Sequence, residues 1–409
     1  MRTTTRLATA LTAAGALTLT ACGGSGFDDD TSTDDAAGRS ISVLIGSSGD
    51  AETAAVTAAV DAWSAESGVD ATVNVASDLS QQLSQGFAGG SPADVFYLTN
   101  DTVATYASNG SLDAYVDGLA NVDDFYPNVL DSFTYDSEVY AAPKDFSTLA
   151  LIINTDLWAA AGLTDADVPT TWDELETVAA ALTTDTTVGL AISPEFARVG
   201  AFFAQNGGWL VDEDGTPVAD SPENVEALTY VKDLMAAGSL RYATDVGAGW
   251  GGEAFGTGAA AMTIEGNWIT GALTNDYPDV AYTVAELPAG PAGKGTIQFN
   301  GGWGVAADSP SKDDATALVE YLTQPEQQLG FSEAFGVMPA VLSAADTWKT
   351  DNPDLAPFLE GADYARSIPS VVGISDVVED LNAQLQALSS GDPQTILDST
   401  QQNLEAIAP

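Results

Sequence analysis

Four tryptophans stand within two residues of a glycine, and this setting favours a role in ligand binding. They are Trp209 in NGGW, Trp250 in GAGWGGE, Trp268 in EGNW and Trp303 in GGWG. Glycine permits tight turns and close backbone approach, so such rings can be presented from loops. An exposed indole then offers a flat apolar face to a ligand. The alternative interpretation is that these rings cover the edges of a core.

Polar residues at the ends of predicted strands could supply hydrogen bonds to the same ligand. Ligands of open α/β sheets bind beyond the carboxyl ends of the strands. Four such ends fall at Ser47-Ser48, at Asn100-Asp101, at Trp268 and at Gly302-Trp303. Their neighbourhood supplies four further candidates, which are Tyr97, Asp145, Glu265 and Arg366.

Local structural roles compete with ligand contact at several of these positions. Asp145 could form a salt bridge with the adjacent Lys144. Asn100 and Asp101 could cap a helix that begins at Thr102. Glu265 could be a solvated loop acid, Tyr97 could lie partly in the core, and Arg366 falls among predicted C-terminal helices.

The composition excludes several classes of function. Histidine is absent from the 409 residues, which removes Ser-His-Asp triads, Cys-His pairs and histidine metal sites. The formal net charge is −48, and the eleven basic residues do not cluster after the first 22 residues, so nucleic acid is excluded as a partner. A phosphorylated ligand is disfavoured for the same reason. We therefore predict no catalytic residues, no metal site and no cofactor.

The first 22 residues have the anatomy of a secretory signal. Arg2 and Arg6 form a positive region, and Leu7–Leu19 is an apolar run that is too short to span a membrane. Leu19-Thr20-Ala21-Cys22 contains the single cysteine and resembles the lipobox of bacterial lipoproteins. We expect residues 1–21 to be a signal peptide, Cys22 to carry lipid, and residues 22–38 to form a flexible acidic tether. An ordinary signal peptide with an incidental cysteine is the alternative.

The folded part is predicted to begin at Ser40 with alternating strands and helices. Strands are expected at 41–46, 71–76 and 94–98, with helices from Asp50 and around Leu79–Phe87 between them. Later elements include a strand at 148–154, a helix opened by the capping box at Thr171–Glu174, and a strand at 259–264. Proline follows a capping residue at Ser193-Pro194, Ser221-Pro222 and Asp392-Pro393, where helices should start. This pattern predicts an α/β fold with a mostly parallel sheet flanked by helices.

Four segments together resemble the extracellular sugar-binding proteins of ABC importers, the family that includes maltose-binding protein. The segments are SPADVFYLTND (91–101), YAAPKDFSTLALIINTDLW (140–158), AAAMTIEGNW (259–268) and FNGGWGVAADS (299–309), and PTTWDEL (169–175) adds to them. The chain from residue 39 onward also exceeds the roughly 250–300 residues at which a single core stops growing, so two lobes are expected.

The resemblance implies a periplasmic-binding-protein-like fold with a ligand cleft at a hinge. Lobe one would comprise residues 39–146 plus 295–336, and lobe two residues 147–294 plus 337–409. The implied function is binding of a carbohydrate, in particular an oligosaccharide, and its delivery to the transmembrane permease subunits of an ABC importer. The protein would be a monomer without enzymatic activity, held by its lipid anchor at the extracellular face of the cell membrane.

Two other functions remain open on the residues alone. A binding lipoprotein for a non-sugar solute such as a polyamine could use the acidic and aromatic candidates. Iron carriers of related fold commonly use adjacent tyrosines, which this chain lacks, and amino-acid or phosphate carriers would need basic residues, which are scarce. An extracellular glycosidase would need two carboxylates at catalytic spacing, and no local motif indicates such a pair.

Overall fold

Short runs of apolar and β-branched residues form the strands that organise the fold. The computed structural model describes residues 39–212 and 214–408, which belong to one compact unit. The predicted signal peptide, Cys22 and the whole predicted tether lie outside the described residues. Within the described ranges, no helix is both long and apolar enough to cross a membrane.

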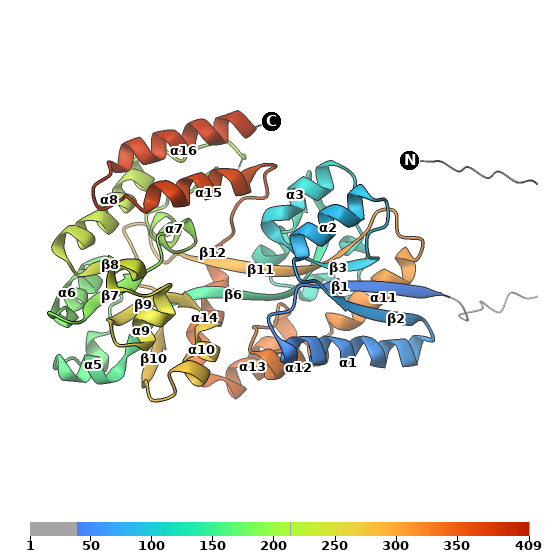
Figure 1. The fold of residues 1–409 in the computed structure, drawn as a ribbon, viewed down its shortest axis with the longest axis horizontal. Helices are drawn as coiled ribbons and strands as arrows, with labels where there is room; N and C mark the ends of the chain where they lie inside the picture. The colour runs from blue at the N-terminus through green and yellow to red at the C-terminus, as the bar shows by residue number, and fades with distance from the viewer. Residues whose placement is uncertain (1–38, 213, 409) are drawn as a thin grey trace, which may run out of the picture. The chain divides into compact units, whose positions relative to one another are not determined.

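The first part of the sheet has the predicted β-α-β-α-β order. Strand β1 pairs in parallel with β2 and with β3. In Figure 1, α1 runs along one side of these strands and α2 and α3 along the other. The elements are β1 (Ser40–Ile45), α1 (Asp50–Ser67), β2 (Asp70–Val75), α2 (Leu79–Ala88), β3 (Val95–Thr99) and α3 (Asn100–Ser108). The spacing of apolar residues therefore predicted this region correctly.

Two long strands, β6 (Ala141–Asn154) and β11 (Thr296–Val305), continue the sheet into its second part. They pair with each other antiparallel, and β11 also pairs antiparallel with β3. The later residues of β6 pair instead with β9 (Ala260–Gly266). The strand order is β2-β1-β3-β11-β6-β9-β7-β8. Figure 1 shows β6 and β11 running side by side through the middle of the fold.

The second part of the sheet again contains parallel pairs, because β7 pairs in parallel with β8 and β9. Helices lie on both sides of it in Figure 1. Its strands are β7 (Val188–Ile192), β8 (Leu240–Tyr242), β10 (Tyr282–Ala285), which pairs with β6, and β12 (Ala365–Arg366), which pairs with β11. Its helices are α5 (Thr155–Ala160), α6 (Trp172–Leu182), α7 (Phe196–Gln205), α8 (Pro222–Ala237), α9 (Gly251–Gly256), α10 (Ile269–Asp276), α15 (Ile374–Leu385) and α16 (Pro393–Ile407).

Five further α-helices and a small two-stranded hairpin lie among the described residues. They are α4 (Pro127–Asp131), the hairpin of β4 (Thr134–Tyr135) and β5 (Glu138–Val139), α11 (Lys312–Leu322), α12 (Pro325–Phe335), α13 (Ala345–Asp351) and α14 (Ala356–Glu360). Helix α12 ends at Gly336, whose φ of 79° is a left-handed conformation that glycine adopts without strain.

Predicted helix starts are partly confirmed. Helices α8 and α16 begin at the proline that follows the capping residue, as expected, and α8 ends at Gly238. The start predicted at Ser193-Pro194 is wrong by two residues, because α7 begins at Phe196. The Phe196 backbone N–H donates 2.7 Å to Oδ1 of Asn382, so a distant side chain satisfies the helix end. Asp50 is the first helical residue of α1, and Gly49 precedes it.

Two large clusters of buried side chains form most of the core. Trp63 packs in the first cluster, and Trp158 and Trp172 pack in the second. The second cluster draws on residues 149–297 and 374–404. The first cluster joins β1–β3 to Phe255 and Ile269 of α9 and α10, so buried packing also connects the two parts of the fold.

Candidate ligand-binding cleft

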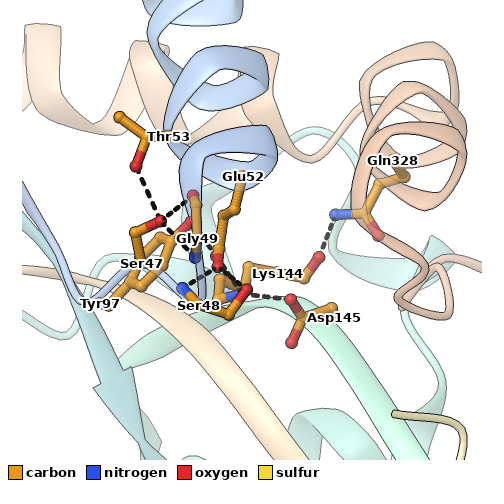
Figure 2. Close-up of polar contacts among 9 residues, drawn as sticks. All are labelled: Ser47, Ser48, Gly49, Glu52, Thr53, Tyr97, Lys144, Asp145 and Gln328. Carbon is orange, nitrogen blue, oxygen red and sulfur yellow. Dashed lines mark hydrogen bonds and ion pairs between the residues drawn. The ribbon is translucent and has the colours of Figure 1, made fainter. Parts of the chain in front are cut away.

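The turn between β1 and α1 is organised by its own side chains. The Ser47 hydroxyl donates 2.7 Å to the Gly49 carbonyl and accepts from the Thr53 hydroxyl at 2.8 Å. The backbone N–H and hydroxyl of Ser48 each donate 2.7 Å to Oε2 of Glu52, in the first turn of α1 (Figure 2). Glu52 is 4% exposed. The turn thus fixes a buried carboxylate at the edge of the sheet.

Lys144 faces this carboxylate from β6. Its ammonium lies 3.5 Å from Oε1 of Glu52 and forms an ion pair with Asp145. The pairing of β6 with β11 shifts register between Gly301 and Gly302, where one more residue of β6 is accommodated at Lys144. Gln328 of α12 donates 2.8 Å to the Lys144 carbonyl, as Figure 2 shows. A bulge and a helix contact therefore place Lys144 between two carboxylates.

Tyr97 completes this group, which we call the Lys144 cluster: Glu52, Tyr97, Lys144 and Asp145. The Tyr97 hydroxyl donates 2.9 Å to Oε1 of Glu52, and the Lys144 ammonium lies 4.4 Å from the Tyr97 ring centroid. Burial and the nearby charges of Glu52 and Asp145 raise the pKa of Tyr97 well above its usual value, so it stays a donor. Burial alone would raise the pKa of Glu52, but the Lys144 charge and the hydrogen bonds from Ser48 and Tyr97 lower it overall.

Aromatic rings form another wall of the same cavity. Trp268 precedes α10 and is 38% exposed. Its ring meets Phe299 of β11 edge to face, with centroids 5.1 Å apart. Phe335, at the end of α12, also lines the cavity. The Asn267 side chain donates 2.7 Å to the Gly336 carbonyl, which links the turn before α10 to the end of α12.

We take this hollow of about 400 Å³ as the candidate ligand cleft. Its volume falls in the range of roughly 300–1,000 Å³ that is typical of small-molecule sites. It brings together four of the predicted residues, Ser48, Tyr97, Asp145 and Trp268. The lining residues that the sequence analysis did not select as ligand contacts include Glu52, Lys144, Asn267, Phe299 and Phe335.

A larger hollow of about 770 Å³ lies between α10, α12 and α13. Its charged lining residues are the acids Glu326, Glu333 and Asp351, and its one ring, Trp348, is only 3% exposed. The smaller cleft combines exposed aromatic surface with paired charges and hydroxyls. The smaller cleft is therefore the better candidate for a ligand site.

Trp303 and Gly302 lie in the core, which corrects their predicted role in ligand contact. Trp303 is 0% exposed and meets Tyr97 edge to face at 4.8 Å. A Cβ at Gly302 would come within 2.8 Å of the Phe133 ring. The glycine at 302 therefore reflects close packing of a strand against a ring, and not a turn that presents an indole.

Trp209 and Trp250 also lie away from the cleft lining. Trp209 is 5% exposed, its ring packs at a tilt against Phe196 with centroids 5.4 Å apart, and the Arg366 guanidinium lies 5.0 Å from its centroid. Trp250 is half-buried against the first core cluster. A Cβ at Gly252 would lie 2.1 Å from the Trp250 ring, so this glycine makes room for the ring.

The remaining polar candidates do not line the cleft. Asn100 is 8% exposed, and its side chain donates 3.3 Å to the Ile368 carbonyl. Asp101 is half-exposed in the first turn of α3. Arg366 donates 3.2 Å to the Gly208 carbonyl. Glu265 is 0% exposed and lies behind Trp268, so it is not a solvated loop acid.

Among residues 39–212 and 214–408, no group of three or more carboxylates or thiols is placed to hold a metal ion.

The chain belongs to the bacterial extracellular solute-binding proteins, whose family model matches residues 58–357. It is similar to the diacetylchitobiose binding protein DasA of Streptomyces coelicolor, with 26% identity over 339 residues, covering 79% of each chain. The GacH receptor of Streptomyces glaucescens, whose structure is known with acarbose, shares 26% identity and a TM-score of 0.77 over 90% of this chain and 98% of that one.

A third similar structure is the cyclic α-maltosyl-1,6-maltose binding protein of Arthrobacter globiformis. It shares 24% identity, with a TM-score of 0.80 over 90% of this chain and 98% of that one. These matches confirm the family and the fold class that the sequence predicted.

Proposed function

We propose that this protein binds a carbohydrate, in particular an oligosaccharide, in the cleft and delivers it to an ABC importer. The observation that carries the proposal is the cleft's composition: the exposed face of Trp268 opens into the same cavity as the Lys144 cluster. Sugars present flat C–H faces together with many hydroxyls. An indole suits the first, and carboxylate, ammonium and hydroxyl groups suit the second.

The charges of the cleft favour a ligand without strong net charge. Lys144 lies between Glu52 and Asp145, so the ammonium is already matched by two carboxylates. A free phosphate would face that excess of negative charge. A polyamine would have to compete with Lys144 for the same carboxylates. Neutral hydroxyls can accept from the ammonium and donate to the carboxylates without breaking the ion pairs.

The ligands named for two relatives also favour a carbohydrate. DasA is a diacetylchitobiose binding protein, and the GacH receptor binds acarbose. The same fold also binds glycerophosphocholine in UgpB of Mycobacterium tuberculosis, at 20% identity, so the fold alone does not select sugars. The cleft residues therefore carry the proposal, and the relatives add support.

We further propose that the chain divides into the two predicted lobes, 39–146 plus 295–336 and 147–294 plus 337–409. The continuity of β6 through both parts of the sheet supports a hinge near Asp145–Leu149. Ligand held between Trp268 and the Lys144 cluster would favour closure, because contacts from both lobes exist together only in the closed state.

A carbohydrate panel tests the function. Maltose, maltotetraose, diacetylchitobiose and acarbose should be compared with spermidine and phosphate by thermal shift and calorimetry. A sugar at 100 times its Kd should stabilise the protein by roughly 2.7 kcal/mol, which raises the melting temperature. Stabilisation by spermidine alone would favour the polyamine alternative, and release of sugar products would favour a glycosidase.

Small-angle scattering tests the proposed closure of the lobes. With a sugar that binds, the radius of gyration should be smaller than without it.

We also propose that Cys22 anchors the protein, as a monomer, at the extracellular face of the membrane beside the permease. One acyl chain binds membranes only marginally, whereas two or more hold a protein stably. Cys22→Ser should therefore move the protein from the membrane fraction to the medium, or leave it unprocessed. Mass spectrometry that finds wild-type Cys22 unmodified in soluble protein would rule out the anchor.

A further inference from the structure

A buried ion pair lies directly behind the aromatic wall of the cleft. Arg198 of α7 donates 2.6 Å from Nη2 to Oε2 of Glu265 in β9. The Arg198 side chain is 10% exposed and that of Glu265 is 0% exposed. Neither residue lines the cleft, so the pair is not placed to touch a ligand held there.

The pair contacts both rings that face the cleft in this region. The indole N–H of Trp268 donates 3.1 Å to Oε2 of Glu265, the oxygen that also accepts from Arg198. The Arg198 guanidinium carbon lies 5.4 Å from the Trp268 centroid and 5.9 Å from that of Phe299. These are cation–π distances. The indole is therefore held through its N–H and through its ring at the same time.

The hydrogen-bonding capacity of the pair is only partly used, which is unfavourable for an ion pair that serves stability alone. Oε1 of Glu265 and Nε of Arg198 are buried without a hydrogen-bond partner. Burial raises the pKa of Glu265, although Arg198 and the indole N–H oppose the shift. Replacing a buried ion pair by apolar residues of similar size is often neutral or stabilising. The closest polar contacts of Arg198 and Glu265 are with one another and with the Trp268 indole N–H.

The chain also leaves space for this carboxylate. A Cβ at Gly251, the first residue of α9, would lie 2.7 Å from Oε1 of Glu265 and 2.5 Å from Oγ1 of Thr263. The glycine in GAGWGGE therefore lets α9 begin against the Glu265 side chain. The carboxylate is confined on one side by this backbone and on the other by Arg198 and Trp268.

We propose that Arg198 and Glu265 are positioning residues that fix the Trp268 indole in the orientation in which it receives the ligand. The proposal rests on the proposed function of the cleft. Without the pair, the exposed indole would sample other rotamers, and binding would have to order it. Ordering one side chain costs enough to weaken affinity by about 2- to 13-fold.

The test compares Glu265→Gln and the double variant Arg198→Met/Glu265→Leu with the wild type. Glu195→Gln is the matched control, because Glu195 is the other carboxylate near Arg198, at 4.0 Å, and its side chain is 49% exposed. Affinity is measured by calorimetry for whichever of maltotetraose, diacetylchitobiose and acarbose binds wild type most tightly. We expect the double variant to bind 2- to 13-fold more weakly, and Glu195→Gln to bind like wild type.

A cycle with Trp268→Ala separates positioning from a general effect on the fold. If the pair acts through the indole, the double variant should cause no further loss of affinity in the Trp268→Ala background. An equal loss in both backgrounds would overturn the proposal. So would a fall in melting temperature without any change in affinity.

A ligand-free measurement keeps the proposal testable if none of these sugars binds. The Trp268 signal is isolated as the difference between each protein and its Trp268→Phe counterpart, because the chain has eight tryptophans. Time-resolved anisotropy of that signal should show a faster indole motion in the double variant. An indole that stays equally ordered would refute the positioning role, whereas absence of binding by wild type would refute only the proposed function.

Discussion

Replacing Trp268 with alanine is expected to weaken sugar binding by about 10- to 150-fold while the fold survives. The exposed part of the indole lines the cleft, so its loss removes apolar contact with the ligand. Burying such a face is worth on the order of 1.5–3 kcal/mol, and each 1.4 kcal/mol changes Kd about tenfold. Calorimetric titration and a thermal melt without ligand measure the two effects separately.

Trp63→Ala is the matched control for this variant. Trp63 lies on the buried face of α1 and is 6% exposed, so its loss should leave a cavity that costs about 3–5 kcal/mol of stability. The two variants should therefore show opposite patterns, one in affinity and one in melting temperature. Wild-type affinity in a destabilised Trp268→Ala protein would remove Trp268 from the site.

Elements with a clear hydrophobic period could be predicted from the sequence. The faces of α1 and α6 carry their tryptophans inward, at the spacing that a helix requires. Local signals failed where a distant contact decided the structure. Helix α7 begins at Phe196 and not at Pro194, and the distant Asn382 side chain accepts from its first helical N–H.

Glycine was an ambiguous guide to the cleft. Glycine near tryptophan predicts an indole that is presented from a loop, and Trp268 has such an exposed ring. Beside Trp303 the glycines instead serve close packing in β11: a Cβ at Gly304 would lie 2.5 Å from the Phe96 ring. A sequence pattern of glycine next to tryptophan does not distinguish these cases, because the nearby ring comes from another strand.

Two residues that line the cleft together with Trp268, Phe335 and Lys144, could not be found as such from local sequence. Phe335 ends a helix nearly 70 residues further along the chain than Trp268, and its local sequence does not indicate that its ring lies at the same cavity. The sequence indicates Lys144 only as a possible salt-bridge partner of the adjacent Asp145, and this ion pair is present. Its second partner, Glu52, comes from the first helix and meets it only through the strand order β1-β3-β11-β6.

Lys144 gives the second large expected effect, on stability. Lys144→Met keeps most of the unbranched side chain but removes its charge, and it leaves Glu52 and Asp145 without their ammonium. The side chains of Glu52 and Lys144 are 5% and 12% exposed. Removing one partner of a buried pair typically costs about 3–5 kcal/mol, because the other charge is left uncompensated. Urea unfolding should show this loss with an unchanged slope.

Lys312→Met is the control for the loss of a lysine charge. Lys312 pairs with Asp113 at 2.6 Å, with side chains 39% and 27% exposed, so this ion pair should contribute only about 0–1 kcal/mol. A Lys144→Met protein that loses no more than Lys312→Met would show that the Lys144 cluster is solvated in solution. That result would also weaken the assignment of the cluster as a fixed part of the cleft.

The pH dependence of the Lys144→Met deficit identifies the carboxylate responsible. In wild type the pKa of Glu52 lies below its usual 4.5, so its ionised form stabilises the fold above that pH, and the stabilisation is lost as pH falls through the lowered pKa. Without Lys144, burial is opposed only by hydrogen bonds, and the pKa of Glu52 should rise. The deficit should therefore be full at pH 7 and should shrink as pH falls through the raised pKa that Glu52 has in the variant, where its carboxylate becomes neutral. A deficit that stays constant down to pH 4 would mean that lost packing of the lysine stem, and not the unpaired Glu52 charge, causes it.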